Sequence, residues 1–394
     1  MNSKALKVYM LVCALYVAIL PLSSALATLI GYMLIVLSVM LPIDVLLCGG
    51  NSINKWQLRI VCLLLVIVVA VSVKPILSAT SADIEDFVKA FFSFFSFLLT
   101  ISIGKISYTR KMLDYYFSIN RFLSFVFILY TILPLPFRYT IADDYGKLQF
   151  TMSMGNPNAT ATRVMFCICL LLIQFAIINR KTDRVINVVL ICGLIYTLIM
   201  LQCRTALLCC LIGLSLTIFK VKISRLIASC MWITPLLFVF IQRLFEMIPM
   251  FQFLNKSLLT GRDTMYEEFV YQIRDNPFSF VFGNFFENHL ENLHNIYFTL
   301  AFNVGFVGII LYLAFWNVEL SQIRNTNDKL KNYAWITIIM FIIQSSAEAA
   351  SMSGSFTYGA MIIFLIRLTK DNLITADGSP VYSVIVKDDR TVDL

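Results

Sequence analysis

Charged residues are scarce in this chain. Only 14% of its 394 residues are Asp, Glu, Lys or Arg, whereas about a quarter is usual for a globular protein. Hydrophobic residues make up 59%, and the mean hydropathy is +0.82. A chain of this composition cannot cover itself with polar surface, which excludes an ordinary water-soluble fold and predicts a membrane protein.

Several functional signatures are missing. No Gly-rich phosphate loop of the Walker type occurs, so nothing supports nucleotide-driven transport. The two histidines, His289 and His294, match no strong metal-ligand spacing, even with Glu291 between them. The ten cysteines lie in or beside apolar segments without polar co-ligands. We therefore expect no metal, no cofactor and no disulfide framework.

Long apolar segments are abundant instead. Each is roughly long enough to cross ~30 Å of hydrocarbon as a helix. They predict an all-α, polytopic membrane protein with about 12 transmembrane helices and both termini in the cytoplasm. The expected spans are 7–24, 27–47, 60–77, 87–104, 117–137, 161–179, 185–202, 205–219, 226–245, 294–316, 334–350 and 355–368.

The positive charges agree with this topology. With both termini inside, 21 of the 31 Lys and Arg residues lie on the cytoplasmic side, as the positive-inside rule requires, while 13 of the 23 carboxylates lie outside. The net charge of +8 therefore reflects topology and not nucleic-acid binding. We expect one transmembrane domain over residues 1–368, which includes a periplasmic segment at 246–293 between the ninth and tenth helices, and a short cytoplasmic tail at 369–394.

Arg204 lies between the seventh and eighth spans, in LIMLQCRTALLCCLIGL, where the turn is extremely short. A charged side chain near membrane depth is costly unless it meets a partner or a wet cavity. The sequence predicts that Arg204 binds an anion. The alternative is a turn residue whose side chain reaches back to the interface.

Two further arginines are expected on the outer face. Arg262 follows Gly261, just before a helix start that Thr264 and Glu267 are spaced to cap. Free backbone amides and a forked donor would lie together there, which suits a diphosphate. Arg163 begins the sixth span directly after GNPNATAT. Arginine holds phosphate oxygens in a planar, two-pronged geometry, whereas lysine acts as a point charge.

His294 stands where the tenth span begins, next to Asn295. A helix start disfavours the protonated imidazole, which leaves a neutral ring able to accept a proton near neutral pH. The alternative is an interfacial histidine that only anchors the helix. Glu348, near the interior of the eleventh span, is expected to pair with an outer arginine.

Several motifs together resemble the bacterial O-antigen polymerase (Wzy) and O-antigen ligase (WaaL) family of polytopic membrane glycosyltransferases. These motifs are QCRTALL (202–208), TGRDTMYEEF (260–269) followed by NPF (276–278), and HNIYFTLAFNVGFVGIILYL (294–313). The stretch GNPNATA (155–161) is similar to an Asn-Pro-Asn stretch often found before a helix in this family. The order of elements covers nearly the whole chain, and the specific motifs cover under a fifth of it.

The resemblance implies a metal-independent glycosyltransferase in the bacterial inner membrane, with its active site facing the periplasm. Its donor would be a glycan linked through diphosphate to undecaprenol, and its acceptor a second glycan. The partners implied are membrane lipid and a chain-length-determining co-polymerase. The expected site comprises His294 as the catalytic base, Arg204, Arg262 and Arg163 on the donor diphosphate, and Asn295, Gly261 and Glu348 as supporting residues.

Three alternatives for the function stay open. A polymerase transfers the glycan to another lipid-linked repeat unit, and a ligase transfers it to the lipid A core. The GNPNATA and LHNIYFTLAFNVGFVG stretches favour a polymerase, although the paired loop repeats of some polymerases are not recognisable here. A flippase for lipid-linked oligosaccharides is the third. Transporters place charges at the membrane midplane and use broken helices, whereas the charged candidates here cluster on the outer side.

Overall fold

Helices make up most of the chain that the computed structural model describes. The described residues are 3–19, 22–23, 25–27, 29–34, 36–37, 40, 59, 108–133, 139–141, 148–152, 157–177, 181–223, 230–237, 252–253, 256–257, 270–271, 280–281, 283, 294–320, 328–346 and 373–374. Within them the expected all-α class is confirmed apart from short strand pairs. The expected spans 60–77, 87–104 and 355–368 lie outside the described residues, and so does most of 226–245.

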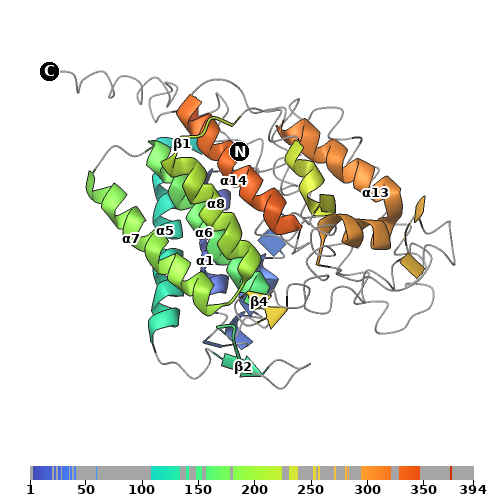
Figure 1. Cartoon of the computed structure of the whole chain (residues 1–394). Coiled ribbons are helices and arrows are strands. Elements are labelled where there is room, and N and C mark those ends of the chain that lie inside the picture. Colours follow the sequence, from blue (N-terminus) through green and yellow to red (C-terminus); the bar gives the residue numbers. More distant parts are fainter. Residues whose placement is uncertain are drawn as a thin grey trace.

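The main helices are ordered along the chain as in Figure 1. They are α1 (Ser3–Ile19), α5 (Arg110–Ile132), α6 (Pro157–Ile177), α7 (Lys181–Met200), α8 (Arg204–Ile218), the 3-10 helix η2 (Met231–Ile233), α13 (Ile296–Leu320) and α14 (Asp328–Ser345). The strands are β1 (Tyr108–Thr109) parallel to β6 (Leu373–Ile374), β2 (Tyr139–Ile141) antiparallel to β3 (Leu148–Phe150), and β4 (Gln252–Phe253) antiparallel to β5 (Lys256–Ser257).

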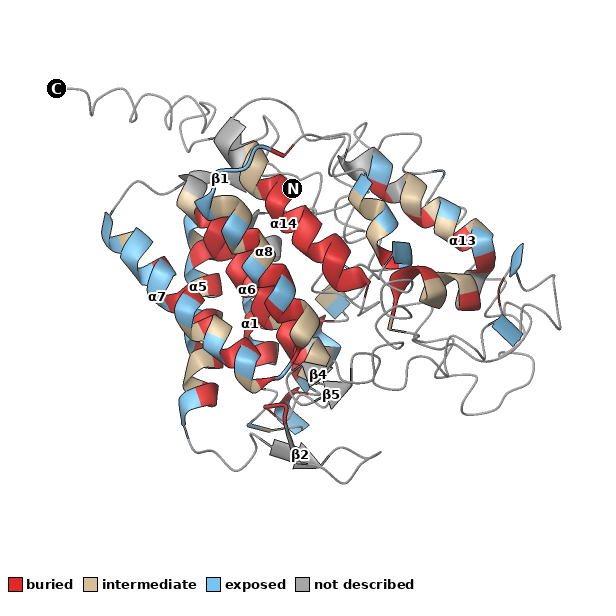
Figure 2. Ribbon diagram, viewed as in Figure 1, coloured by how far each residue is buried: buried red, intermediate tan, exposed pale blue. Residues whose placement is uncertain are grey.

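α6 is the central helix of a bundle. It packs against α5, α7, α8 and α14, and α1 covers α5 on the outside. Residues 164–174 of α6 are all buried, and so are residues 334–346 at the end of α14. A helix that is apolar all round is stable only inside such a shell of neighbours. Figure 2 shows both helices buried along most of their length, with exposed residues concentrated on α7.

The helices alternate in direction, so the bundle has two distinct ends. At one end, Gln344 of α14 contacts Thr162 near the start of α6. At the other, Arg121 of α5 contacts Asp183 at the start of α7, and Asn332 near the start of α14 contacts the chain after α8. We name these the Gln344 end and the Arg121 end. The starts of α6, α8 and α13 therefore lie at the Gln344 end.

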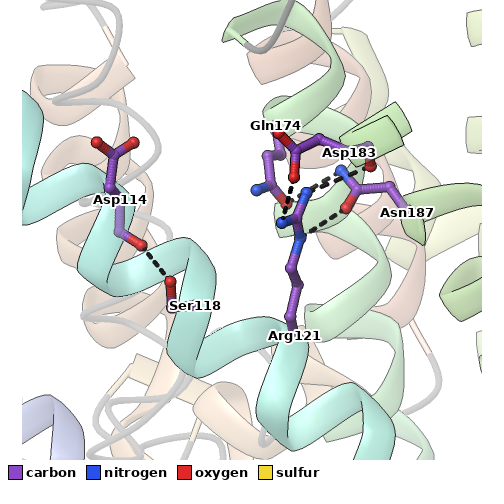
Figure 3. A network of polar contacts seen from close by, with 6 residues as sticks. All are labelled: Asp114, Ser118, Arg121, Gln174, Asp183 and Asn187. Carbon is purple, nitrogen blue, oxygen red and sulfur yellow. Dashed lines mark hydrogen bonds and ion pairs between the residues drawn. The ribbon is translucent and has the colours of Figure 1, made fainter. Parts of the chain in front are cut away.

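A polar network ties three helices together at the Arg121 end (Figure 3). The Arg121 guanidinium donates to Asp183 Oδ1 at 2.8 Å and to Asn187 Oδ1 at 2.9 Å, and Asn187 Nδ2 donates to Gln174 Oε1 at 3.0 Å. Asn187 and Gln174 are buried, while Arg121 and Asp183 stay partly exposed. The network links α5, α6 and α7, and every buried amide in it has a partner, as buried polar groups require.

α13 differs from the expected straight helix of residues 294–316. Its backbone breaks at Gly305, where φ is 66° and ψ is −168°, a combination that is essentially restricted to glycine. Phe306, the next residue, stacks on Phe280 with ring centroids 5.7 Å apart. Figure 1 shows α13 bent and set to one side of the bundle. The expectation of an unbroken tenth span was therefore wrong.

Other boundaries also differ from the expected spans. α1 ends at Ile19, not residue 24, and α5 ends at Ile132, not residue 137. Pro21 and Pro134 follow these ends, and the residue before a proline is disfavoured in helical conformation. The starts of α5, α6, α7 and α14 come four to seven residues earlier than expected, because their first turns are polar and still helical.

Two helices in the described part are long and apolar enough to cross a membrane, Asp114–Ile132 and Lys181–Met200. Shorter apolar helices run over Lys7–Ile19, Thr160–Phe175, Arg204–Ile218 and Gly305–Ala314. On α7, large apolar side chains face outward: Val185 and Val189 are 62% and 63% exposed. Exposed apolar surface of this extent is typical of a protein that contacts lipid or a partner.

Candidate functional site

Four segments meet at the Gln344 end. Gln344 Nε2 donates to Thr162 Oγ1 of α6 at 3.0 Å, and Cys209 Sγ of α8 lies 3.9 Å from Gln344 Oε1. Two residues further on, the Ser346 carbonyl accepts from Asn295 Nδ2 at 3.1 Å. The end of α14 therefore contacts the first turns of α6 and α8 and the residue that precedes α13.

Asn295 fixes the start of α13 from inside the protein. Its side chain is fully buried, and Oδ1 accepts from the backbone amides of Tyr297 at 3.0 Å and Phe298 at 3.4 Å, as an N-cap residue does. Nδ2 also donates to the Pro235 carbonyl at 2.9 Å. One amide thus caps α13 and holds it against α14 and the chain around η2.

His294 lies directly before this cap. It is partly buried, and its φ of 55° is in the left-handed region, which is uncommon for a residue with a side chain. Such a conformation costs of order 1 kcal/mol and persists only where neighbouring contacts hold it. The contacts of Asn295 supply that restraint, so the position of the imidazole is set by the junction of α13 with α14.

Arg163 interrupts the buried surface of the central helix. Of residues 160–174, it alone is not fully buried. It follows Thr162, the residue that Gln344 contacts, so it lies level with the end of α14. A guanidinium held here among apolar helices, and still partly accessible, is placed to bind an anion.

Arg204 is the first residue of α8, after a tight turn from α7. Gln202 in that turn has a φ of 52°, and the amide of Leu201 donates to Thr197 O at 3.0 Å. Arg204 is partly exposed and lies on the helix face that also carries Leu208 and Leu211, which are 49% and 48% exposed. A cation in the first turn opposes the helix dipole, so this arginine does not stabilise α8.

Arg163, Arg204 and His294 are therefore brought to one end of the molecule. Arg204 precedes Cys209 by five residues, which places it roughly 7.5 Å further along the axis than the Gln344 contact. The expected residues Arg262, Gly261 and Glu348 lie outside the described residues.

The electrostatic character of the Gln344 end is positive. The partial positive charges at the starts of α6, α8 and α13 add to the guanidiniums of Arg163 and Arg204. In the described part of the chain, no carboxylate lies in the first two turns of these helices or in the last two turns of α14. Nor do the described residues include a group of three or more His, Cys, Asp or Glu that could hold a metal ion. Such an arrangement suits a multiply charged anion.

Gln344 and Thr162 were missed from sequence. Their signal is a polar residue inside an apolar run, as in FIIQSS and NATATR, and it gives no partner. The same holds for Gln174 and Asn187 at the Arg121 end. Only the packing of α14 against α6 reveals that Gln344 and Thr162, which are 182 residues apart in sequence, form one contact.

No protein-family model and no curated protein matches this chain. The grounds for a function are therefore the arrangement of these residues and the motifs of the sequence.

Proposed function

We propose that this protein is a membrane glycosyltransferase that takes its glycan from undecaprenyl diphosphate on the periplasmic face of the bacterial inner membrane. The acceptor is the non-reducing end of another lipid-linked repeat unit, which makes the protein a polysaccharide polymerase. The observation that carries the proposal is the meeting of Arg163, Arg204 and His294 at the Gln344 end, where three helices begin.

The proposed roles follow from the chemistry of the three side chains. His294 accepts the proton of the acceptor hydroxyl while its oxygen attacks the anomeric carbon of the donor sugar. The bond from that carbon to the diphosphate oxygen breaks, and undecaprenyl diphosphate leaves with the electron pair. Arg163 and Arg204 stabilise the charge that develops on the leaving diphosphate, so neither a metal nor a general acid is needed for its departure.

The distribution of basic residues supports a periplasmic site. The described lysines and arginines gather at the Arg121 end, which the positive-inside rule places in the cytoplasm. These residues are Lys181, Arg184, Lys220, Lys222 and Lys331. The Gln344 end would then face the periplasm. We infer that the chain crosses the membrane about twelve times with both termini inside, and that Arg262 with Gly261 and Glu348 completes the site from the outer side.

Arg204 supports access of a lipid-linked donor from the membrane. Because it shares an exposed face of α8 with Leu208 and Leu211, a donor moving sideways between helices would meet this arginine first. Arg163 lies in the central helix and would hold the diphosphate once the donor has entered. The polyprenyl tail could stay in lipid throughout, while its phosphates remain at the interface.

The proposal is tested with the purified protein in liposomes, supplied with an undecaprenyl-diphosphate-linked repeat unit. The wild-type protein should give a ladder of longer glycans on a gel, and His294→Ala should abolish it. Full activity of His294→Ala, with normal insertion in the membrane, would remove His294 from the mechanism. Deletion of the gene then separates the acceptors, because single capped repeat units indicate a lost polymerase and bare core indicates a lost ligase.

One observation favours a second function, movement of a lipid-linked oligosaccharide across the membrane. Transporters use broken helices at their binding sites, and α13 is broken at Gly305. In liposomes, a transporter would carry the labelled donor to the other leaflet without lengthening its glycan. Transfer without lengthening would therefore replace the glycosyltransferase proposal.

A further inference from the structure

Gln344 is a fully buried amide at a position where an apolar side chain would fit. The residues before it in α14, Met340 to Ile343, are apolar and buried. Its Nε2 donates to Thr162 Oγ1 at 3.0 Å, and its Oε1 lies 3.9 Å from the Cys209 thiol. The side chain thus contacts both α6 and α8 from α14.

The contact continues into the backbone of α6. Thr162 Oγ1 accepts from Gln344 and donates to the Asn158 carbonyl at 2.9 Å, one turn earlier. Nearby, Thr160 Oγ1 donates to the Thr151 carbonyl at 3.3 Å. The first two turns of α6 are therefore held from two sides, by α14 and by the chain that follows β3. Arg163 is the next residue after Thr162.

Stability alone does not account for this pair. A hydrogen bond between membrane helices contributes little on average, and replacing both partners by apolar groups of the same shape is often nearly neutral. A methionine and a valine would fill the same space as Gln344 and Thr162. The pair does, however, fix the rotation and height of α6 beside α14, and Arg163 moves with both.

We infer that Gln344 is a positioning residue: through Thr162 it sets the position of the Arg163 guanidinium on the donor diphosphate. The inference rests on the proposed function for the identity of the ligand. Ser346, two residues later, accepts from Asn295 beside His294. The last turn of α14 is thus a common support for the group that holds the leaving diphosphate and for the group that takes the proton.

The test measures the Kd of undecaprenyl diphosphate for the purified full-length protein in detergent micelles. Gln344→Met and Thr162→Val should each weaken binding about tenfold, because a small misplacement of a gripping group is costly. Thr162→Ser keeps the hydroxyl and should bind as the wild type does. In an Arg163→Ala background, Gln344→Met should change the Kd by less than about twofold, since coupled residues are not additive.

The inference is overturned if Gln344→Met binds as tightly as the wild type, or if it weakens binding equally with and without Arg163. Should Gln344→Met fail to fold, the comparison of Thr162→Val with Thr162→Ser decides alone, and equal affinities would overturn it. Failure of the proposed function looks different. In that case Arg163→Ala and Gln344→Met weaken binding as expected, yet the wild-type protein lengthens no glycan.

Discussion

The junction held by Asn295 offers a sharp test of how the site is built. In Asn295→Ala, the carbonyls of Pro235 and Ser346 lose their donor in a buried environment, and the amides of Tyr297 and Phe298 lose their cap. Each buried unsatisfied group costs about 1–3 kcal/mol, and loss of an N-cap costs about 1 kcal/mol. Even the lower values lead us to expect a loss of about 3 kcal/mol in the free energy of unfolding, a large share of the ~5–15 kcal/mol of a typical protein.

Asn332 at the opposite end is the matched control. Its side chain also accepts from one backbone amide, that of Ile223 at 2.8 Å, and donates to one carbonyl, that of Val221 at 2.8 Å. It is only half-buried, so water can replace the lost partners. Asn332→Ala should therefore cost about 1 kcal/mol.

Both variants are measured by SDS titration in mixed micelles, followed by tryptophan fluorescence. Asn295→Asp adds a second comparison, because it keeps the cap acceptor and sets a carboxylate against two carbonyls. It should be at least as destabilising as the alanine variant. If Asn295→Ala costs no more than Asn332→Ala, the junction of α13 with α14 is not held as described.

Three further outcomes are expected. A Cβ at Gly213 would clash with a methionine sulfur of α14, so the alanine variant should lose about 1–3 kcal/mol of stability, whereas Gly31→Ala, where the nearest atom is 3.6 Å away, should lose none by calorimetry. Gly305→Ala should cost about 1–3 kcal/mol from backbone strain, and an unchanged melting temperature would contradict the break in α13. In whole cells stripped of their outer membrane, an impermeant maleimide should label Gln202→Cys, and should label Lys222→Cys only after permeabilisation; the reverse pattern would invert the topology.

Hydrophobicity located the helices well and their ends poorly. The expected span 205–219 nearly coincides with α8 at Arg204–Ile218, because apolar residues begin directly after the turn. α7 was expected to start at residue 185 but starts at Lys181. Its first turn carries Lys181, Asp183 and Arg184, which lower the hydropathy but continue the helix towards water, where Asp183 binds Arg121.

The break in α13 could not be foreseen from the apolar run, since glycine is also common inside membrane helices. Only the φ of 66° at Gly305 distinguishes a break from an ordinary helical glycine.

The candidate site was predictable in part. A charge at the threshold of an apolar segment is a strong signal, so Arg163, Arg204 and His294 stand out, and their placement at one end follows from the alternating direction of the helices. The supporting residues behave differently. Gln344 and Thr162 are ordinary polar residues in apolar surroundings, and their importance depends on a contact across the bundle that no spacing in the sequence encodes.

The most direct measurement is photo-crosslinking with an undecaprenyl diphosphate analogue that carries a diazirine beside its phosphates. After illumination of the membrane-embedded protein, the labelled peptides are mapped by mass spectrometry. We expect labels on the starts of α6 and α8 and on the chain around His294, and we expect Arg163→Ala to reduce them. Labels at the Arg121 end, or labels spread evenly around the bundle, would contradict a diphosphate site formed by Arg163, Arg204 and His294.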